Sequence, residues 1–348
     1  MNTIRKKTVR KKNSNAGLLA ATGLVGMAAA ALVVRRRRRY DLRDKVVLIT
    51  GGSRGLGLVL AREFGSRGAR LAICARDSAA LERAAEDLRH RGYTVRAFEC
   101  DVTDQSQVER MMQGIRDQLG PVDVLVNNAG VISVGPLETM TLDDYRESLD
   151  THLWAALYTM MAVLPEMRRR RSGRIVNISS IGGTVSVPHL VPYCAGKFAL
   201  AGLSEGVRTE TLKDHVYVTT VYPGLMRTGS PRNAFFKGKH RAEYAWFSIS
   251  DALPLFSISA ERAARAIVSG CERGSARLVL SVPAKLAAAA YHLFPASPDI
   301  LAAIEKLLPG PGGIGTERAY GRDSSSFASP SVVTVLNERA AARNNEVA

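Results

Sequence analysis

Cysteine is scarce and scattered in this sequence. Its four residues, Cys74, Cys100, Cys194 and Cys271, form no CxxC pair and have no histidine-rich neighbours. This spacing argues against both a zinc site and a disulfide framework, so we expect no bound metal. A reducing compartment fits such cysteine usage best.

Acidic residues are missing before Asp41, where the chain instead carries many cations. The eleven positive charges of this segment are Arg5, Lys6, Lys7, Arg10, Lys11, Lys12 and Arg35–Arg39. They account for most of the formal net charge of +16 and leave only five net charges for the rest of the chain. So small an excess does not predict nucleic-acid binding by the body of the protein.

Long apolar runs are absent except for residues 17–34, which carry no charge. As a helix this run would be about 27 Å long, close to the roughly 30 Å of a hydrocarbon core. Ten of its eighteen residues are Ala, Gly or Thr, and basic clusters flank both ends, so neither insertion nor orientation is strongly encoded. We predict that residues 1–40 form a basic tail with an uncleaved membrane anchor at residues 17–34, the domain that follows lying on the cytoplasmic side. The alternative is a cytoplasmic protein with a disordered leader, from a start site upstream of Met27.

Seven short runs rich in aliphatic and β-branched residues follow, separated by amphipathic helical patterns such as Ser78–Arg91. The predicted strands are Lys45–Thr50, Arg70–Ala75, Thr94–Glu99, Val122–Asn127, Gly173–Ile178, Tyr217–Tyr222 and Arg277–Val282. Nearly continuous apolar strands that alternate with helices are typical of a parallel sheet covered on both faces. The sequence therefore predicts an α/β fold, a Rossmann-type, doubly wound, seven-stranded parallel sheet flanked by helices.

We expect one domain, residues 41–283, with extensions at both ends. Residues 284–308 contain two apolar helical segments split around Pro295 and Pro298. Residues 309–348 begin with a Gly- and Pro-rich breaker, and we predict that they form a disordered tail.

The first predicted strand runs directly into a glycine-rich turn and then a helical pattern. The turn reads Thr50-Gly51-Gly52-Ser53-Arg54-Gly55-Leu56-Gly57. Glycines let the backbone approach a diphosphate, and the new helix directs free N–H groups and its positive dipole end at the phosphates. We therefore predict dinucleotide binding at Gly51, Ser53, Arg54, Gly55, Leu56 and Gly57. Taken alone, the turn leaves open a tight connection without a ligand.

The residue after the second strand distinguishes the two nicotinamide dinucleotides. An acid there would bind the adenosine ribose hydroxyls, whereas a cation favours the 2′-phosphate. Arg76 stands at this place, and Arg54 can reach the same phosphate from the turn. The sequence thus predicts NADP(H) rather than NAD(H). The alternative is that both arginines are solvated and that Asp77 binds the ribose.

Further motifs follow along the chain. Asp101-Val102, Asn127-Asn128-Ala129-Gly130, Ser180 and Pro223-Gly224 stand at the ends of later strands, and Tyr193-Cys194-Ala195-Gly196-Lys197 stands between the last two of these on a predicted helix. With the glycine-rich turn, this order resembles the short-chain dehydrogenase/reductase family over residues 41–282. The resemblance implies that Asp101 and Val102 bind at the adenine and that Asn128, Ala129 and Gly130 shape the strand edge against the cofactor. It also implies that Pro223, Gly224 and Thr228 line the nicotinamide.

Tyr193 and Lys197 are four residues apart, so both side chains project from one face of a helix. The ammonium can lower the pKa of the tyrosine from about 10. The resemblance implies that Tyr193 protonates a carbonyl oxygen while NADPH delivers hydride, with Ser180 bonded to that oxygen and Lys197 holding the nicotinamide ribose. We predict an enzyme that interconverts a carbonyl and an alcohol. The alternative is a catalytically idle NADP(H)-binding regulatory protein.

One residue departs from the family pattern. The family usually has an asparagine that feeds a water to the lysine in a proton relay, and His152 stands at this place. Histidine can carry protons through two nitrogens and titrates near neutrality, so His152 is a candidate catalytic residue. A packing role without catalysis is equally compatible with the sequence.

The segment after Thr228 is rich in aromatic residues: Phe235, Phe236, Tyr244, Trp246, Phe247 and Phe256. They favour an apolar pocket and a small hydrophobic carbonyl or alcohol as substrate. Lid packing or a subunit contact in a homo-oligomer are the alternatives. The cluster Arg168–Arg171 precedes the fifth strand and should lie with Arg35–Arg39 at the non-catalytic sheet edge. Both clusters could contact anionic lipid there, although a solvated helix end explains Arg168–Arg171 equally well.

Overall fold

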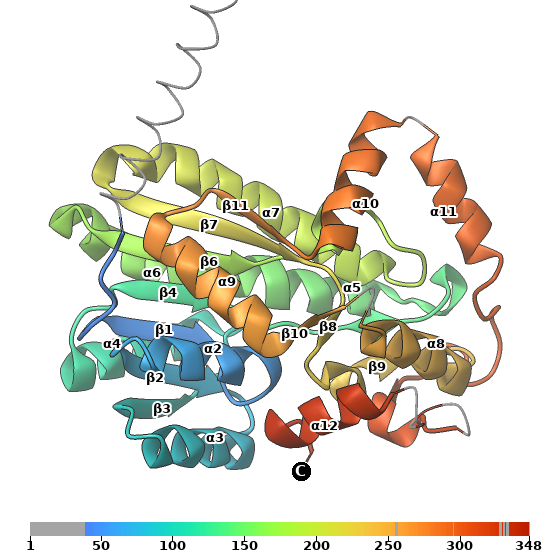
Figure 1. The fold of residues 1–348 in the computed structure, drawn as a ribbon, viewed down its shortest axis with the longest axis horizontal. Helices are drawn as coiled ribbons and strands as arrows, with labels where there is room; N and C mark the ends of the chain where they lie inside the picture. Colours follow the sequence, from blue (N-terminus) through green and yellow to red (C-terminus); the bar gives the residue numbers. More distant parts are fainter. Residues whose placement is uncertain are drawn as a thin grey trace, which may run out of the picture. The chain divides into compact units, whose positions relative to one another are not determined.

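A computed structural model describes residues 39–254, 257–294, 296–326, 329, 331 and 334–347. Its central feature is a parallel sheet with the strand order β11-β7-β6-β4-β1-β2-β3 (Figure 1). The strands are β1 (Val46–Thr50), β2 (Arg70–Ala75), β3 (Val95–Glu99), β4 (Val124–Asn127), β6 (Gly173–Ile178), β7 (Val216–Pro223) and β11 (Arg277–Leu280). The predicted seven-stranded, doubly wound sheet is therefore confirmed, with strand ends that differ by at most two residues.

Helices cover both faces of this sheet. One apolar cluster joins the sheet to α2 (Gly55–Gly65), α3 (Ser78–His90) and α9 (Ala260–Arg273). A second cluster joins the opposite face to α4 (Gln105–Leu119), α6 (Ala155–Arg170) and α7 (Val191–Thr211). Strand β1 explains the continuous apolar runs: Val47 and Ile49 belong to the first cluster, and Val46 and Leu48 belong to the second. Because successive side chains point to opposite faces, a strand covered on both sides needs an apolar residue at every position.

The order of the strands fixes where a ligand can bind. From β1 the chain first adds β2 and β3 on one side, and then returns to build β4, β6, β7 and β11 on the other. The connections after β1 and β4 therefore leave in opposite directions. In open α/β sheets, the crevice at the carboxyl ends of such diverging strands is the usual binding site.

Short elements surround that end of the sheet. A small sheet joins β5 (Ser133–Val134), β9 (Phe235–Phe236) and β12 (Ala319–Tyr320), and β8 (Met226–Arg227) pairs with β10 (Ile258–Ser259). The helices on this side are α5 (Leu142–Leu149) and α8 (His240–Ala252), and a π-helical turn, η2 (Asp150–Trp154), joins α5 to α6. The 3-10 turns in the described part of the chain are η1 (Leu137–Thr139), η3 (Ile181–Gly183), η4 (Leu212–Asp214), η5 (Ser230–Asn233) and η6 (Gly321–Asp323).

The C-terminal part of the chain is more structured than its composition predicts. Helices α10 (Val282–Leu293) and α11 (Ser297–Glu305) fall where two apolar segments are expected. Within the stretch 309–348, predicted to be disordered, the structure instead forms β12, η6 and α12 (Val335–Arg343). Helix α12 buries Asn337, Ala340 and Ala341. Small and polar residues of this kind give no apolar periodicity, and their tertiary contacts order the segment instead.

The predicted anchor, residues 17–34, lies outside the described residues. Among the helices that the structure describes, none combines the length and the apolar character needed to cross a membrane. In the second basic cluster, Arg168 Nε lies 3.3 Å from Asp214 Oδ2, and Arg170 Nη1 lies 2.9 Å from Asp123 Oδ1. Two of its four guanidinium groups thus have carboxylate partners within the protein.

Candidate active site

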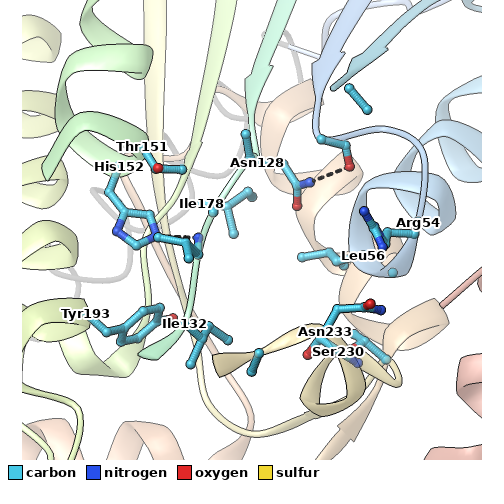
Figure 2. A pocket seen from close by; sticks show the side chains of 18 of the residues that line it. Arg54, Leu56, Asn128, Ile132, Thr151, His152, Ile178, Tyr193, Ser230 and Asn233 are labelled. Atoms are coloured by element: carbon cyan, nitrogen blue, oxygen red, sulfur yellow. Dashed lines mark hydrogen bonds between the residues drawn. The ribbon is translucent and has the colours of Figure 1, made fainter. Parts of the chain in front are cut away.

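The glycine-rich turn between β1 and α2 forms one wall of a cavity of about 550 Å³ (Figure 2). Gly51 has φ +62°, and a Cβ there would lie 2.9 Å from the Ala129 Cα. A Cβ on Gly57 would overlap the Gly51 carbonyl oxygen. Within the described residues, no side chain caps the start of α2 at Gly55. The positive end of this helix is therefore suited to an anion.

The end of β4 holds the turn in place. The Thr50 hydroxyl accepts hydrogen bonds from the Asn128 N–H (3.0 Å) and the Ala129 N–H (3.1 Å). In return, the Asn128 side-chain amide donates to the carbonyl oxygens of Thr50 and Gly51, each at 3.1 Å. These contacts fix the two diverging strands β1 and β4 to each other at the mouth of the crevice.

Charged groups gather beyond β2, at the end of the cavity where the sequence predicts adenosine. Arg76 Nη1 lies 3.7 Å from Asp101 Oδ2, and the Arg76 side chain is 69% exposed. Arg54 Nη2 lies 3.8 Å from Asp77 Oδ2. Asp77 also caps α3 by accepting a hydrogen bond from the Ala80 N–H at 2.9 Å. Of the two side chains after β2, the Asp77 carboxylate is thus engaged in the fold, whereas the Arg76 side chain is largely exposed and can contact a ligand.

Helix α7 and the end of β6 form the opposite wall. Tyr193 and Lys197 lie one turn apart on α7, and Ser180 follows β6. The Ser180 hydroxyl oxygen accepts a hydrogen bond from the Gly182 N–H at 3.0 Å, which leaves its own proton for another acceptor. Lys197 Nζ is buried and donates to the Ile178 carbonyl oxygen at 2.9 Å. Ser179 secures this region by donating to the Lys197 carbonyl oxygen at 2.9 Å.

Burial dominates the titration of this pair. It lowers the pKa of Lys197 to about 7. It raises the pKa of Tyr193 above its usual value of 10.0, and the hydrogen bond with Ser180 opposes this only in part. The expected lowering of the tyrosine pKa by Lys197 is therefore not seen here, because burial of the phenol raises this pKa. A buried tyrosine that keeps its proton can donate it to a ligand in the cavity.

His152 lies on the π-helical turn η2 and is 1% exposed. Its Nε2 accepts a hydrogen bond from the Val131 N–H at 3.3 Å, so the ring proton is on Nδ1. Nδ1 lies 3.2 Å from the Ser148 hydroxyl, which itself donates to the Pro192 carbonyl oxygen at 2.7 Å. Burial, helped by the charge of Lys197, lowers the pKa of His152 well below 6.5. Both nitrogens are thus occupied, which favours a positioning role for a neutral ring packed edge-on against Tyr193.

We expect His152 to make the protein acid-sensitive. Its pKa is depressed only in the folded state, so below about pH 6.5 the unfolded chain binds a proton that the folded chain does not. Stability is complete above this pH and then falls by up to about 1.4 kcal/mol per pH unit. His152→Asn should remove this dependence in urea titrations between pH 7.5 and 5, whereas the exposed His90→Asn should retain it. Equal slopes for the two variants would contradict the assignment.

The strand β7 and the loop after it complete the cavity. Pro223, Gly224 and Thr228 line it, and Thr228 is held by a hydrogen bond from its hydroxyl to the Ser230 hydroxyl at 2.9 Å. Below them, the buried Asp251 accepts a hydrogen bond from the Met226 N–H at 2.9 Å. Burial raises the pKa of Asp251 to about 7. The side chain therefore fixes the backbone of β8 from beneath the site.

All the predicted site residues except Ser53 and Gly57 line this one cavity. Ser53 is buried, and its carbonyl oxygen accepts a hydrogen bond from the Asn345 side chain at 2.8 Å. Of the lid aromatics that the structure describes, only Phe235 lines the cavity, whereas Phe236, Tyr244 and Phe247 pack in a separate core cluster. Phe256 lies outside the described residues.

Several residues of the cavity are not apparent from the sequence. They are Ile132, Ser230, Asn233, Tyr320, Arg322 and Glu346. Ile132 is the second residue after the Asn-Asn-Ala-Gly motif, which is a local signal for it. The C-terminal residues Tyr320, Arg322 and Glu346 come from a segment without a motif or an apolar period, and only the folded chain brings them to the site.

Comparisons with known proteins agree with this geometry. The family model described as short chain dehydrogenase matches residues 45–236. The dehydrogenase/reductase SDR family member 7B of Danio rerio is 36% identical over 221 residues, covering 62% of this chain and 72% of that protein. The crystal structure of a short-chain dehydrogenase from Streptomyces avermitilis matches with a TM-score of 0.64 and 31% identity, covering 76% of this chain and 96% of that chain.

A metagenomic short-chain oxidoreductase, solved in complex with NADP, matches with a TM-score of 0.51 and 34% identity over 53% of this chain and 84% of that chain. The matched family model covers more than half of the present chain and includes the turn, Ser180, Tyr193 and Lys197. The chain therefore belongs to the short-chain dehydrogenase family and is an oxidoreductase that acts on CH–OH or C=O groups.

Proposed function

We propose that the protein interconverts a carbonyl and an alcohol on a hydrophobic substrate, with NADP(H) as its cofactor. One observation carries the proposal: Ser180, Tyr193 and Lys197 line the same cavity as the glycine-rich turn and Arg76. The complex of the metagenomic relative with NADP supports the choice of cofactor.

The donor set around the turn fits a phosphorylated dinucleotide. The start of α2 offers backbone N–H groups and a positive dipole end to the diphosphate. Arg54 and Arg76 can form forked contacts with a 2′-phosphate, while Asp101 and Val102 border the adenine end and Pro223 the nicotinamide end. When bound, the cofactor supplies or accepts the hydride. Because Asp77 already caps α3, the arginines favour NADP(H) over NAD(H).

Residues of the protein transfer the proton and stabilise the charge that develops on the carbonyl oxygen of the substrate. Tyr193 donates its proton to the carbonyl oxygen during reduction and takes it back during oxidation. The Ser180 hydroxyl donates a hydrogen bond to the same oxygen and stabilises the negative charge that develops there. Lys197, fixed by the Ile178 carbonyl, holds the ribose of the cofactor.

The remaining cavity wall indicates the kind of substrate. Ile132, Ala234, Phe235 and Tyr320 line the cavity, and the rings of Phe235 and Tyr320 lie 4.7 Å apart between centroids. Such a wall fits an apolar body next to the reacting carbonyl better than a sugar or a small acid. We therefore propose hydrophobic ketones, aldehydes or the matching alcohols as the substrate class.

Arg76→Ala should weaken the preference for NADPH. We expect kcat/KM with NADPH to fall about tenfold, equivalent to about 1.4 kcal/mol, and kcat/KM with NADH to change little. Arg89→Ala removes an arginine of α3 that pairs with Glu82 instead of lining the cavity, and it should leave both values unchanged. If the ratio of kcat/KM with NADPH to kcat/KM with NADH stayed the same in Arg76→Ala, Arg76 would not be the residue that recognises the 2′-phosphate.

The function itself is tested by NADPH oxidation with a panel of ketones and aldehydes of increasing apolar size. We expect turnover to rise with apolar area until the cavity is filled. A purified protein that binds NADPH but turns over none of the panel would instead support an idle regulatory protein. A protein whose thermal stability does not respond to NADPH would contradict the proposed cofactor.

A further inference from the structure

The C-terminal residues of the chain reach the phosphate-binding turn. Helix α12 packs beside η5, where the Asn337 side chain accepts a hydrogen bond from the Gly229 N–H at 3.1 Å. Gly229 has φ +93°, and a Cβ there would overlap Ala341. Arg232 Nη1 lies 2.8 Å from Glu338 Oε2 and ties the same helix to η5. The last turn of α12 is thereby brought to the mouth of the cavity.

The residues that follow α12 cross the glycine-rich turn. The Asn344 carbonyl oxygen accepts a hydrogen bond from the Gly55 N–H at 2.9 Å, at the first residue of α2. The Asn345 side chain donates to the carbonyl oxygens of Ser53 and Ala80, both at 2.8 Å. Arg62 adds a bond from Nη1 to Asn344 Oδ1 at 3.2 Å. The chain end is thus fastened to the element that the proposed function assigns to the diphosphate.

Glu346 places a carboxylate inside the cavity. It is 7% exposed, it lines the cavity, and its Oε1 occupies the space that a Cβ on Gly55 would fill. Its Oε2 accepts a hydrogen bond from the Asn233 side chain at 2.5 Å. Figure 2 shows Asn233 on the same side of the cavity as Arg54 and Leu56. A carboxyl group supplied by the protein therefore lies at the start of α2, where an anionic ligand would bind.

We propose that residues 344–346 are an autoinhibitory latch, in which the Glu346 carboxyl group occupies the place of the cofactor's diphosphate and must leave before the cofactor binds. The latch rests on the proposed function, because it takes the cavity as a dinucleotide site. Only molecules whose latch is released can bind the cofactor, so the apparent affinity for the cofactor falls in proportion to the released fraction. The Glu346 carboxyl group fills the space beside Gly55, and the Asn344 carbonyl oxygen occupies the Gly55 N–H, so the latch and the diphosphate cannot be bound at once.

The latch gives cofactor binding a dependence on pH. Burial raises the pKa of Glu346 from 4.5 to about 7, although the Asn233 hydrogen bond and the charges of Arg54 and Arg232 oppose it. The docked latch therefore holds a proton more tightly than the released one. Docking is favoured as the pH falls below about 7, and this advantage is lost as the pH rises through that value. Inhibition is thus stronger at pH 6 than at pH 8.5.

The test measures the Kd for NADPH of the wild-type protein, of Glu346→Ala and of Val347→Ala, each at pH 6 and at pH 8.5. Val347 is adjacent and 44% exposed, so its replacement should leave the Kd unchanged. We expect Glu346→Ala to bind NADPH about tenfold more tightly than the wild type at pH 6, with a smaller difference at pH 8.5. The ratio of the two proteins cancels the titration of the NADPH phosphate itself. A Kd that is unchanged or weaker in Glu346→Ala at pH 6 would overturn the latch.

Hydrogen exchange in residues 335–347 separates this proposal from the proposed function. We expect NADPH to accelerate exchange in this segment, because the cofactor displaces it, whereas protection by NADPH would mean that the segment closes over the cofactor and would overturn the latch. If neither the wild type nor Glu346→Ala binds NADPH, the proposed cofactor is wrong. The same exchange experiment with inorganic diphosphate then decides the latch: acceleration supports it, and unchanged or slower exchange refutes it.

Discussion

Tyr193→Phe is expected to abolish carbonyl reduction while NADPH still binds. The phenol is the only group of Tyr193 that can give a proton to the substrate oxygen, and positioned acids of this kind contribute about 10²–10⁴-fold to rates. The ring itself stays packed against His152, with centroids 5.4 Å apart, so the substitution should not disturb the fold. The raised pKa of Tyr193 keeps the proton on the oxygen, which is the state that reduction requires. We therefore predict a loss in kcat of about 10²–10⁴-fold with little change in the Kd for NADPH.

Tyr158→Phe is the matched control for this measurement. Tyr158 lies on α6 and stacks on Trp154 at 6.3 Å between centroids, away from the cavity lining. Its loss of a hydroxyl should leave kcat within about twofold, as for surface substitutions remote from a site. If Tyr193→Phe kept a kcat close to that of Tyr158→Phe, the proton would have to come from another group.

The largest expected effect on stability is that of Lys237→Met. Lys237 Nζ donates to Asp144 Oδ2 at 2.5 Å, and the two side chains are only 3% and 4% exposed. Removal of the ammonium leaves a buried carboxylate without its counter-ion, which costs about 3–5 kcal/mol of the free energy of unfolding. Asp144 also accepts hydrogen bonds from the N–H and hydroxyl of Thr141 at the start of α5. These bonds hold the carboxylate in its buried position when the ammonium is removed. We expect the urea midpoint of Lys237→Met to fall accordingly.

The exposed pair of Arg146 and Asp143 provides the comparison. Its side chains are 68% and 86% exposed, and Arg146→Met should cost less than about 1 kcal/mol because water screens such pairs. The double variant Lys237→Met with Asp144→Asn should recover part of the loss, since it leaves no buried charge. A Lys237→Met protein as stable as Arg146→Met would mean that the buried pair contributes nothing. Because Lys237 follows β9, its loss should also loosen Phe235 at the cavity wall.

The sheet and most of the cavity could be predicted because their signals are local. The four successive apolar residues Val46–Ile49 of β1 indicate a strand covered on both faces. The turn that follows is recognised by its glycines, of which Gly51 is required by the close approach of Ala129. Tyr193 and Lys197 are one helical turn apart by sequence alone. Strand order then gathers the other motifs at one sheet edge, since each of them follows the carboxyl end of a parallel strand.

The partners of these groups could not be predicted, because they lie far away in the sequence. Spacing places Lys197 on the face of Tyr193, but it does not show that the ammonium donates to the Ile178 carbonyl. The identity of His152 suggests a proton carrier, whereas its contacts with Val131 and Ser148 occupy both nitrogens. Glu346 gives no signal at all, because its site exists only where the chain end meets Gly55. Such contacts depend on tertiary packing and leave no period in the sequence.

The central claim, hydride transfer to a carbonyl with Tyr193 as the acid, is tested most directly with NADPH that carries deuterium at the transferred position. A hydrophobic ketone from the active part of the panel is incubated with this cofactor, and the alcohol is analysed by mass spectrometry. We predict one deuterium on the former carbonyl carbon with the wild-type protein and about 10²–10⁴-fold less labelled alcohol from Tyr193→Phe in the same time. Alcohol without deuterium, or equal amounts of labelled alcohol from both proteins, would contradict the account.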